Sequence, residues 1–240
     1  VGDEVLLEDV LLGLEGAGVV QAVGSEVSLF QVGDEVFYAG ALQRQGANSE
    51  LHVVDERIVG HKPRSLGFAE AAALPLTAIT AWELLFERLK IAEGSASSGQ
   101  SLLIIGAAGG VGSILTQLAR QLTGLTVIGT VSSEAKAEVA RAHGCAHTIN
   151  YSHEDVAQRV RELTDGVGVN VVFDSVGKPT FMGSLDSLKR RGLMVCVGTA
   201  SGPIEGFNPQ ILAMKGSLFL TRPALADYLA GVLPAAPEER

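Results

Sequence analysis

The chain has 240 residues, a formal net charge of −9 and no block of like charges. That length can bury a sizeable core in one large or two modest domains. The negative charge makes a nucleic acid or an anionic membrane surface an unfavourable partner. The most apolar stretch, residues 102–118, is broken by glycines, and no secretory signal precedes it. We therefore expect no membrane segment and a cytoplasmic protein.

Residues 1–72 are predicted to form β structure. Short β-rich runs bounded by glycine or polar residues occur at 18–24, 35–38, 51–54 and 57–59. No helical pattern separates these runs, so they predict a small, strongly bent barrel rather than a parallel sheet. Helical patterns follow over residues 68–73 and, after an interruption at Pro75, over residues 77–90.

The pattern changes at residue 101, where apolar strands begin to alternate with helices. Strands are predicted after the first one at 126–131, 147–150, 169–173, 193–197 and 218–220, and helices at 134–142, 155–163 and 181–189. This alternation is typical of a parallel, doubly wound α/β sheet. We expect two domains, residues 1–72 and residues 73–240.

A glycine-rich corner at residues 102–112 (LLIIGAAGGVG) organises the second domain. A buried strand runs into a tight turn, and a helical pattern begins immediately after it. This context is the one in which a dinucleotide binds, because the N–H groups of the first helical turn face the pyrophosphate. Ala107 stands where the G-x-G-x-x-G fingerprint has its first glycine. A purely structural turn is the alternative interpretation.

The end of the second strand distinguishes the two nicotinamide cofactors. An NAD site has an acidic residue there, about 20 residues after the corner, for the ribose 2′-hydroxyl. Here the strand ends in Ser132 and Ser133, with Lys136 one helical turn further on. Hydroxyls and a lysine favour a 2′-phosphate and therefore NADPH. Glu134 is explained by the helix dipole, and the two serines could equally serve only to cap the helix.

Several motifs together resemble the medium-chain dehydrogenase/reductase superfamily. The shared segments are residues 13–20 (GLEGAGVV), 32–36 (VGDEV), 71–77 (AAALPLT) and 107–112 (AAGGVG). Four further segments resemble the quinone oxidoreductase (zeta-crystallin-like) branch, namely residues 129–133 (GTVSS), 174–177 (DSVG), 191–195 (RGLMV) and 215–223 (KGSLFLTRP). Residues 37–85 look closer to the zinc-type alcohol dehydrogenase-like proteins of that branch.

The resemblance implies a Rossmann doubly wound sheet, a partial GroES-like bent barrel and a cofactor in the cleft between them. The positions that it assigns to NADPH are Thr77, Ala108, Gly109, Gly110, Val111, Gly112, Thr130, Ser132, Ser133, Lys136, Tyr151, Val176, Gly177, Gly198, Phe219 and Leu220. Of these, Lys136 and Tyr151 match positions around the 2′-phosphate. Val176 and Gly198 match positions near the nicotinamide ribose and ring, Phe219 and Leu220 match positions that face the carboxamide, and Thr77 matches one near the nicotinamide.

The same resemblance indicates whether a zinc ion is bound and how the hydride is transferred. Zinc-dependent members carry Gly-His-Glu, where this chain has Gly13-Leu14-Glu15, and leucine cannot bind zinc. We expect no metal, and hydride transfer that depends on positioning of ring and acceptor. A quinone takes its protons from water, so no catalytic side chain is named. A serine hydrolase based on Ser113 or Ser175 is disfavoured because neither lies in G-x-S-x-G.

The predicted function is an NADPH-dependent quinone reductase. Relatives have a longer segment before the match to Gly13 and continue beyond Tyr228, so the sequence suggests a chain truncated at both ends. An NADPH-dependent enal or enone reductase and an inactive nucleotide-binding protein are the alternatives. Barrel strands missing from the chain would leave apolar surface that favours association, and we expect a homodimer.

Overall fold

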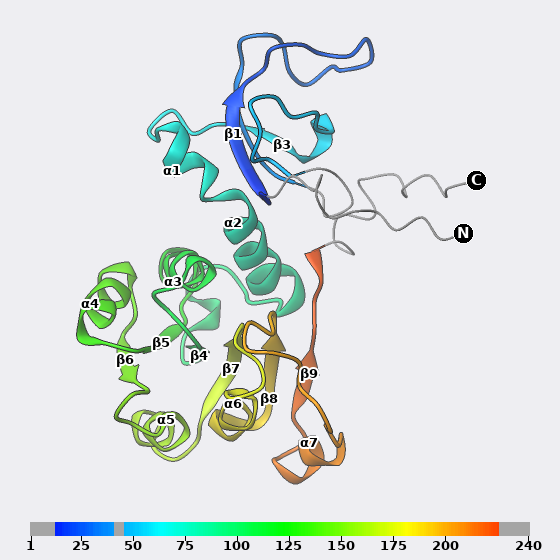
Figure 1. Cartoon of the computed structure of the whole chain (residues 1–240). Helices are drawn as coiled ribbons and strands as arrows, with labels where there is room; N and C mark the ends of the chain where they lie inside the picture. The colour runs from blue at the N-terminus through cyan, green and yellow to red at the C-terminus, as the bar shows by residue number, and fades with distance from the viewer. Residues whose placement is uncertain (1–12, 41–45, 226–240) are drawn as a thin grey trace, which may run out of the picture. The chain divides into compact units, whose positions relative to one another are not determined.

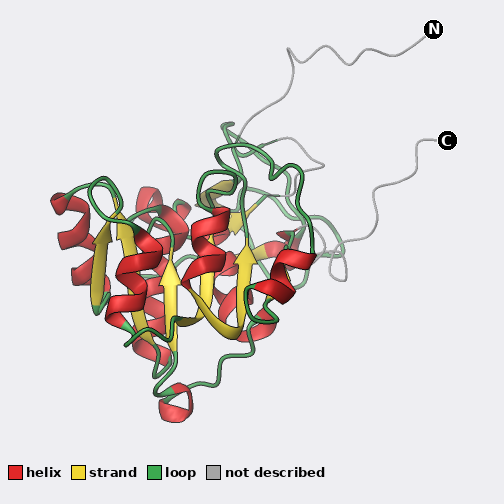
Figure 2. Cartoon of the chain, turned by 90° about the horizontal axis from the view of Figure 1, so that it is seen from below, coloured by secondary structure: helices red, strands yellow, loops and turns green. Residues whose placement is uncertain are grey.

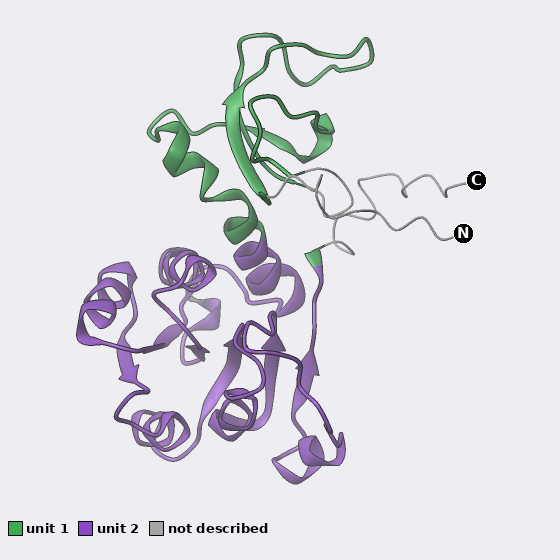
Figure 3. Cartoon of the chain, viewed as in Figure 1, with its two compact units in different colours: residues 1–79, 225–240 green, residues 80–224 purple. Residues whose placement is uncertain are grey.

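The computed structural model describes residues 13–40 and 46–225, and its contacts divide into two compact units (Figure 3). Unit 1 comprises residues 1–79 and 225–240, and unit 2 comprises residues 80–224. The division falls between Ile79 and Thr80, inside helix α2 (Pro75–Trp82), whereas the sequence places a boundary between residues 72 and 73. None of the described helices is long and apolar enough to cross a membrane.

Unit 1 contains an antiparallel sheet in the order β1 (Glu15–Val19), β2 (Glu35–Ala39), β3 (Val59–His61). Helix α1 (Phe68–Ala72) packs against β1. The prediction of a strand at 35–38 is confirmed, but residues 51–54 form no strand. This run has β propensity, but Leu51 and Val53 are 76% and 83% exposed. A strand is stabilised when such side chains pack against neighbours, and that burial is missing here.

Two other predicted boundaries are wrong for local reasons. Residues 57 and 58 belong to the 3₁₀ helix η2 (Glu56–Ile58), which the Asp55 carboxylate begins by accepting the Arg57 N–H at 3.0 Å. Pro75 starts α2 instead of interrupting a helix, since a missing N–H costs nothing at the first helical position. The six residues after α2 form the π-helical turn η3 (Glu83–Arg88).

Unit 2 is built on a six-stranded parallel sheet in the order β6-β5-β4-β7-β8-β9 (Figure 1). Its strands are β4 (Ser101–Ile104), β5 (Thr126–Val131), β6 (His147–Asn150), β7 (Val169–Asp174), β8 (Leu188–Cys196) and β9 (Phe219–Thr221). Counted from β4, the order is 3-2-1-4-5-6, which defines the Rossmann-type fold. The prediction of a doubly wound sheet is confirmed.

Helices cover both faces of this sheet (Figure 2). The helical segments of unit 2 after η3 are η4 (Ser95–Ser97), α3 (Gly110–Leu122), α4 (Glu134–His143), α5 (Val156–Leu163), α6 (Phe181–Ser187) and α7 (Gln210–Met214). Side chains alternate along β4: Leu102 and Ile104 lie in the core beneath α3 and α4, and Leu103 lies in the core beneath α5 and α6. Burial on both faces explains why this strand is continuously apolar.

Arg161 on α5 fastens two connections of unit 2. Its guanidinium donates to the carbonyl oxygens of Gly166 at 3.2 Å and Val167 at 2.6 Å, and to those of Asp186 at 2.8 Å and Leu188 at 2.9 Å. The planar fork of arginine can satisfy several acceptors at once. One side chain therefore holds the loop before β7 against the junction of α6 and β8.

We predict that Arg161→Ala lowers the free energy of unfolding by about 2 kcal/mol, because hydrogen bonds from a charged donor are lost. Arg161→Lys should recover only part of the loss, since one ammonium cannot reach all four carbonyls. Chemical denaturation measures the change, with Gln158→Ala on the exposed surface of the same helix as control. Equal stabilities of the Arg161→Ala and Gln158→Ala variants would contradict the assignment.

Candidate functional site

The glycine-rich corner leaves the carboxyl end of β4, between β5 and β7, where the strand order reverses. Ligands of open α/β sheets bind outside the carboxyl ends of the strands at such a switch point. Gly106 has φ +78° and turns the chain out of the strand. Its N–H donates to the Thr130 Oγ1 at 2.9 Å, and the Ala107 N–H donates to the Thr130 carbonyl at 3.0 Å. Thr130 is fully buried and therefore positions the turn.

Gly112 allows the first turn of α3 to lie directly on the corner. A Cβ at this position would come within 2.4 Å of the Gly106 carbonyl oxygen and 2.9 Å of the Ala107 Cα. Both are backbone atoms that cannot move aside as the end of a flexible side chain can. Gly109 is less constrained, because its Cβ would meet the Gly106 oxygen at 3.2 Å. The last glycine of the fingerprint is thus required for helix–strand packing.

The departure from the fingerprint at Ala107 is compensated on the neighbouring strand. Ala107 is fully buried, and its methyl group occupies space that Gly129 of β5 leaves open. A Cβ at Gly129 would lie 2.5 Å from the Ala107 Cβ and 2.7 Å from the Cys145 Sγ. The alanine therefore leaves the corner intact.

The first turn of α3 presents backbone donors. The Ser113 N–H bonds to the Gly109 carbonyl at 2.8 Å. Within residues 13–40 and 46–225, the N–H groups of Ala108, Gly110, Val111 and Gly112 form no hydrogen bond. Together with the positive end of the helix dipole, such N–H groups form an anion-binding site.

The ends of β5 and β6 bring the predicted 2′-phosphate residues together. Ser133 begins α4 and accepts the Lys136 N–H at 3.4 Å, while the Lys136 Nζ lies 3.1 Å from the Ser132 Oγ. The Tyr151 N–H donates to the Val131 carbonyl at 3.1 Å, and its side chain is exposed. Glu134 forms an ion pair with Arg141, so its carboxylate is neutralised by a residue two turns along the helix.

The turn between β7 and α6 is fixed by Asp174, a residue that the sequence did not single out. Its buried carboxylate accepts four hydrogen bonds, at 2.7–3.1 Å, from the Val176 and Gly177 N–H groups and the Thr180 and Ser184 hydroxyls. Its place at the end of a buried strand, in the motif DSVG, was the available signal. Asp174 thereby fixes the turn that carries two predicted site residues.

Gly198 lets the ends of β7 and β8 approach each other closely. A Cβ there would come within 2.5 Å of the Ser175 carbonyl oxygen. The following residues cover the turn, because the Ser201 N–H and hydroxyl both donate to the Val176 carbonyl, at 3.1 and 2.7 Å. Val176, Gly177 and Gly198 thus form one rigid edge at the carboxyl end of the sheet.

The two cysteines belong to the core. Burial raises the pKa of the Cys145 thiol, opposed by a hydrogen bond with Thr116. Burial also raises the pKa of Cys196; the charge of Asp174 adds to this and Arg222 opposes it. Both thiols are therefore kept protonated and are poor nucleophiles.

The remaining predicted residues lie on the edge strand and in unit 1. Phe219 is 53% exposed on β9 and pairs in register with Leu193, and Leu220 is half-buried beside Met194. Thr77 lies in the unit 1 part of α2, where its hydroxyl donates to the Ala73 and Leu74 carbonyls. Within unit 2, the glycine corner contacts the end of β5, and the end of β5 contacts the turn after β6. Thr77 belongs to unit 1.

A zinc ion does not fit the described residues. Leu14 cannot be a ligand, and the Glu15 carboxylate accepts the Leu76 N–H at 2.7 Å, at the start of α2. No group of three or more His, Cys, Asp or Glu residues in residues 13–40 and 46–225 is arranged to hold a metal. Glu15 is thus a helix-capping residue, which the sequence did not reveal because its partner is far along the chain.

Comparison with known proteins agrees with this fold. The family described as "Alcohol dehydrogenase GroES-like domain" matches residues 3–82, and that described as "Zinc-binding dehydrogenase" matches residues 110–224. A Rossmann-type sheet with a glycine corner, joined to a GroES-like domain, defines an alcohol dehydrogenase-like class of protein. The chain belongs to the medium-chain dehydrogenase/reductase superfamily.

Three proteins show which members of the superfamily this chain resembles. A quinone oxidoreductase of Pseudomonas aeruginosa is 51% identical over 218 residues, covering 90% of this chain and 64% of that protein. A 2-haloacrylate reductase of a Burkholderia species is 44% identical, covering 92% and 65%. The crystal structure of Escherichia coli quinone oxidoreductase complexed with NADPH has a TM-score of 0.83 and 42% identity, covering 91% and 65%. The chain spans about 64% of the length of its curated quinone oxidoreductase relatives.

We predict that Gly112→Ala lowers the free energy of unfolding by about 1–3 kcal/mol, because the new methyl group displaces backbone. Gly183→Ala on α6 is the matched control, since nothing lies within 4 Å of a Cβ there. Alanine in that open helical position should leave stability unchanged or raise it. Denaturant titrations compare the two variants, and similar effects at both positions would contradict the packing argument.

Proposed function

We propose that this chain is part of an NADPH-dependent oxidoreductase that reduces a quinone without zinc. The observation that carries the proposal is the Lys136–Ser132 pair at the end of β5, beside a helix whose first-turn N–H groups form no bond within the described residues. The quinone oxidoreductase relatives and the NADPH-complexed structure support it.

The corner fits the pyrophosphate of a dinucleotide. Gly112 and Gly106 let the backbone of α3 approach without side chains in the way, as the contacts of a Cβ at Gly112 indicate. The N–H groups of Gly110, Val111 and Gly112 would donate to the phosphate oxygens. Ala108 and Gly109 would line the approach, and Thr130 would hold the turn from below.

The adenosine end supports NADPH over NADH. Lys136, Ser132, Ser133 and Tyr151 would surround the 2′-phosphate with a positive charge and hydroxyl groups. A free carboxylate at this point would repel the phosphate, but Glu134 at the start of α4 is paired with Arg141. Lys136 would therefore attract the 2′-phosphate, while Arg141 neutralises the carboxylate that could repel it.

The nicotinamide end supplies positioning. Val176, Gly177 and Gly198, held by Asp174, would orient the ribose and ring, with Phe219 and Leu220 at the carboxamide. Thr77 lies in unit 1, and its role stays a prediction of the sequence. When bound, reduced nicotinamide supplies a hydride, and a quinone that takes it up with a proton from water becomes a hydroquinone. The protein's part is the orientation of ring and acceptor.

Reduction of an activated carbon–carbon double bond is a second candidate. The 2-haloacrylate reductase relative favours it, since its name describes such an acceptor. A positioned hydride donor without a metal suits both reactions.

The location of the protein is a separate proposal, and two free, buried cysteines are in keeping with a cytoplasmic protein. We also propose a homodimer, which sedimentation would test.

Turnover distinguishes the candidates. NADPH oxidation is followed at the nicotinamide absorbance with a benzoquinone or an alkenal as acceptor. Faster oxidation with the quinone supports the proposal, and faster oxidation with the alkenal favours the second candidate. Saturable NADPH binding with no oxidation by either acceptor would contradict both reactions for this chain while leaving cofactor binding intact.

We predict that Lys136→Ala raises the Kd for NADPH by about tenfold, because a charge-assisted contact to the phosphate is lost. The Kd for NADH should change by less than about twofold, since NADH has no 2′-phosphate. Lys189→Ala is the control, because it removes an equal charge at the opposite end of the sheet. Lys189 lies near the start of β8, which pairs with the start of β7. Equal losses for both cofactors would contradict the role of Lys136.

A further inference from the structure

The turn between β6 and α5 carries Tyr151 and is unusually well fixed. The Ser152 N–H bonds to the Asn150 Oδ1 at 3.1 Å, and the His153 and Glu154 N–H groups bond to the Asn150 carbonyl at 3.0 Å. The Ser152 hydroxyl also donates to the Ser132 carbonyl at 3.2 Å. The turn is thereby joined to the serine whose own hydroxyl contacts Lys136.

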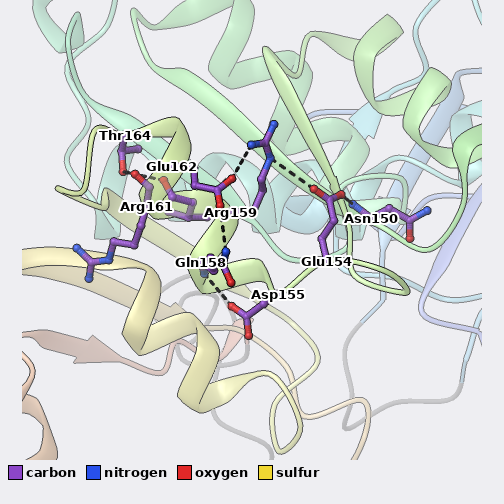
Figure 4. A network of polar contacts seen from close by, with 9 residues as sticks. Asn150, Glu154, Asp155, Gln158, Arg159, Arg161, Glu162 and Thr164 are labelled. Atoms are coloured by element: carbon purple, nitrogen blue, oxygen red, sulfur yellow. Dashed lines mark hydrogen bonds and ion pairs between the residues drawn. The ribbon is translucent and has the colours of Figure 1, made fainter.

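Glu154 closes this turn, and Arg159 holds Glu154 (Figure 4). One carboxylate oxygen of Glu154 accepts the Asn150 N–H at 2.7 Å, and the other lies 3.4 Å from the Arg159 Nε. The Glu154 side chain is 37% exposed, so solvent screens part of its charge and any effect on a nearby phosphate is modest. A carboxylate thus stands directly behind the turn that would face a phosphate.

We propose that the Glu154–Arg159 pair is a positioning element that strengthens the preference for NADPH. Glu154 fixes the Tyr151–Ser152 turn beside Ser132, and Arg159 neutralises Glu154, which would otherwise repel the 2′-phosphate. The inference rests on the proposed function, because only NADPH carries that phosphate. It gives two residues behind the turn a share in cofactor choice, in addition to that of Lys136.

A purely structural role for Arg159 is the alternative. Arg159 also pairs with Glu162 one turn along α5, with the Nη1 2.7 Å from the Oε2, and Gln158 bonds to the same carboxylate at 3.1 Å. Arg159 and Gln158 lower the pKa of Glu162. If stabilising α5 were the whole role of Arg159, its loss would affect folding and leave the ratio of cofactor affinities unchanged.

The test measures the Kd for NADPH and for NADH by fluorescence titration of the full chain, together with the thermal midpoint. Arg159→Gln leaves the Glu154 charge uncompensated, and we expect about two- to fivefold weaker NADPH binding with unchanged NADH binding. Glu162→Gln is the matched control, since it removes the other ion pair of Arg159 but not the contact with the turn. It should leave the ratio of the two Kd values unchanged.

A double variant separates charge from structure. In Glu154→Gln the amide oxygen can still accept the Asn150 N–H, so Glu154→Gln/Arg159→Gln removes both charges and keeps the turn. We expect it to restore NADPH binding to within about twofold of the wild type, as coupled residues should. A double variant as weak as Arg159→Gln, or an unchanged ratio in Arg159→Gln, would overturn the inference alone. A wild-type chain that binds NADPH no better than NADH would overturn the proposed cofactor as well.

Discussion

The contact between Gly112 and the Gly106 carbonyl is the constraint on which the rest of unit 2 depends. A methyl group would come within 2.4 Å of that oxygen, so the first turn of α3 can lie on the corner only without a side chain. The contact sets where α3 starts and aims its first N–H groups past the end of β4. The same corner is bonded to Thr130, so the end of β5 is fixed by the same geometry.

The candidate site extends from this corner along the carboxyl ends of the parallel strands. Three of the six strands end in a turn fixed by a buried or paired polar group: Thr130 for β4, Glu154 for β6 and Asp174 for β7. Buried carboxylates are costly unless their acceptors are filled, and Asp174 meets this condition with four donors. Rigid turns give the pre-organisation that a metal-free hydride transfer requires.

The central strands of unit 2 are predictable from sequence because they are buried on both faces. The strand at 126–131 has its predicted bounds, and five of its six residues are buried. The edge strand at 147–150 also has its predicted bounds, although only Ile149 of its four residues is buried. Unit 1 was harder: the run at 51–54 has the composition of a strand, but Leu51 and Val53 are exposed. Strand propensity there depends on packing partners that composition does not reveal.

The site was predictable where the chemistry lies in neighbouring residues and not where it depends on distant ones. Ser132 and Lys136 are only four residues apart, on the two sides of the start of α4, so their proximity is visible in the sequence. The compensation of Ala107 by Gly129 and the bond between Glu15 and Leu76 join residues far apart in sequence, and no local pattern indicates them. Such long-range contacts decide whether the corner keeps its shape. That shape is set within unit 2, because Gly106, Ala107, Gly112, Gly129 and Thr130 all belong to it.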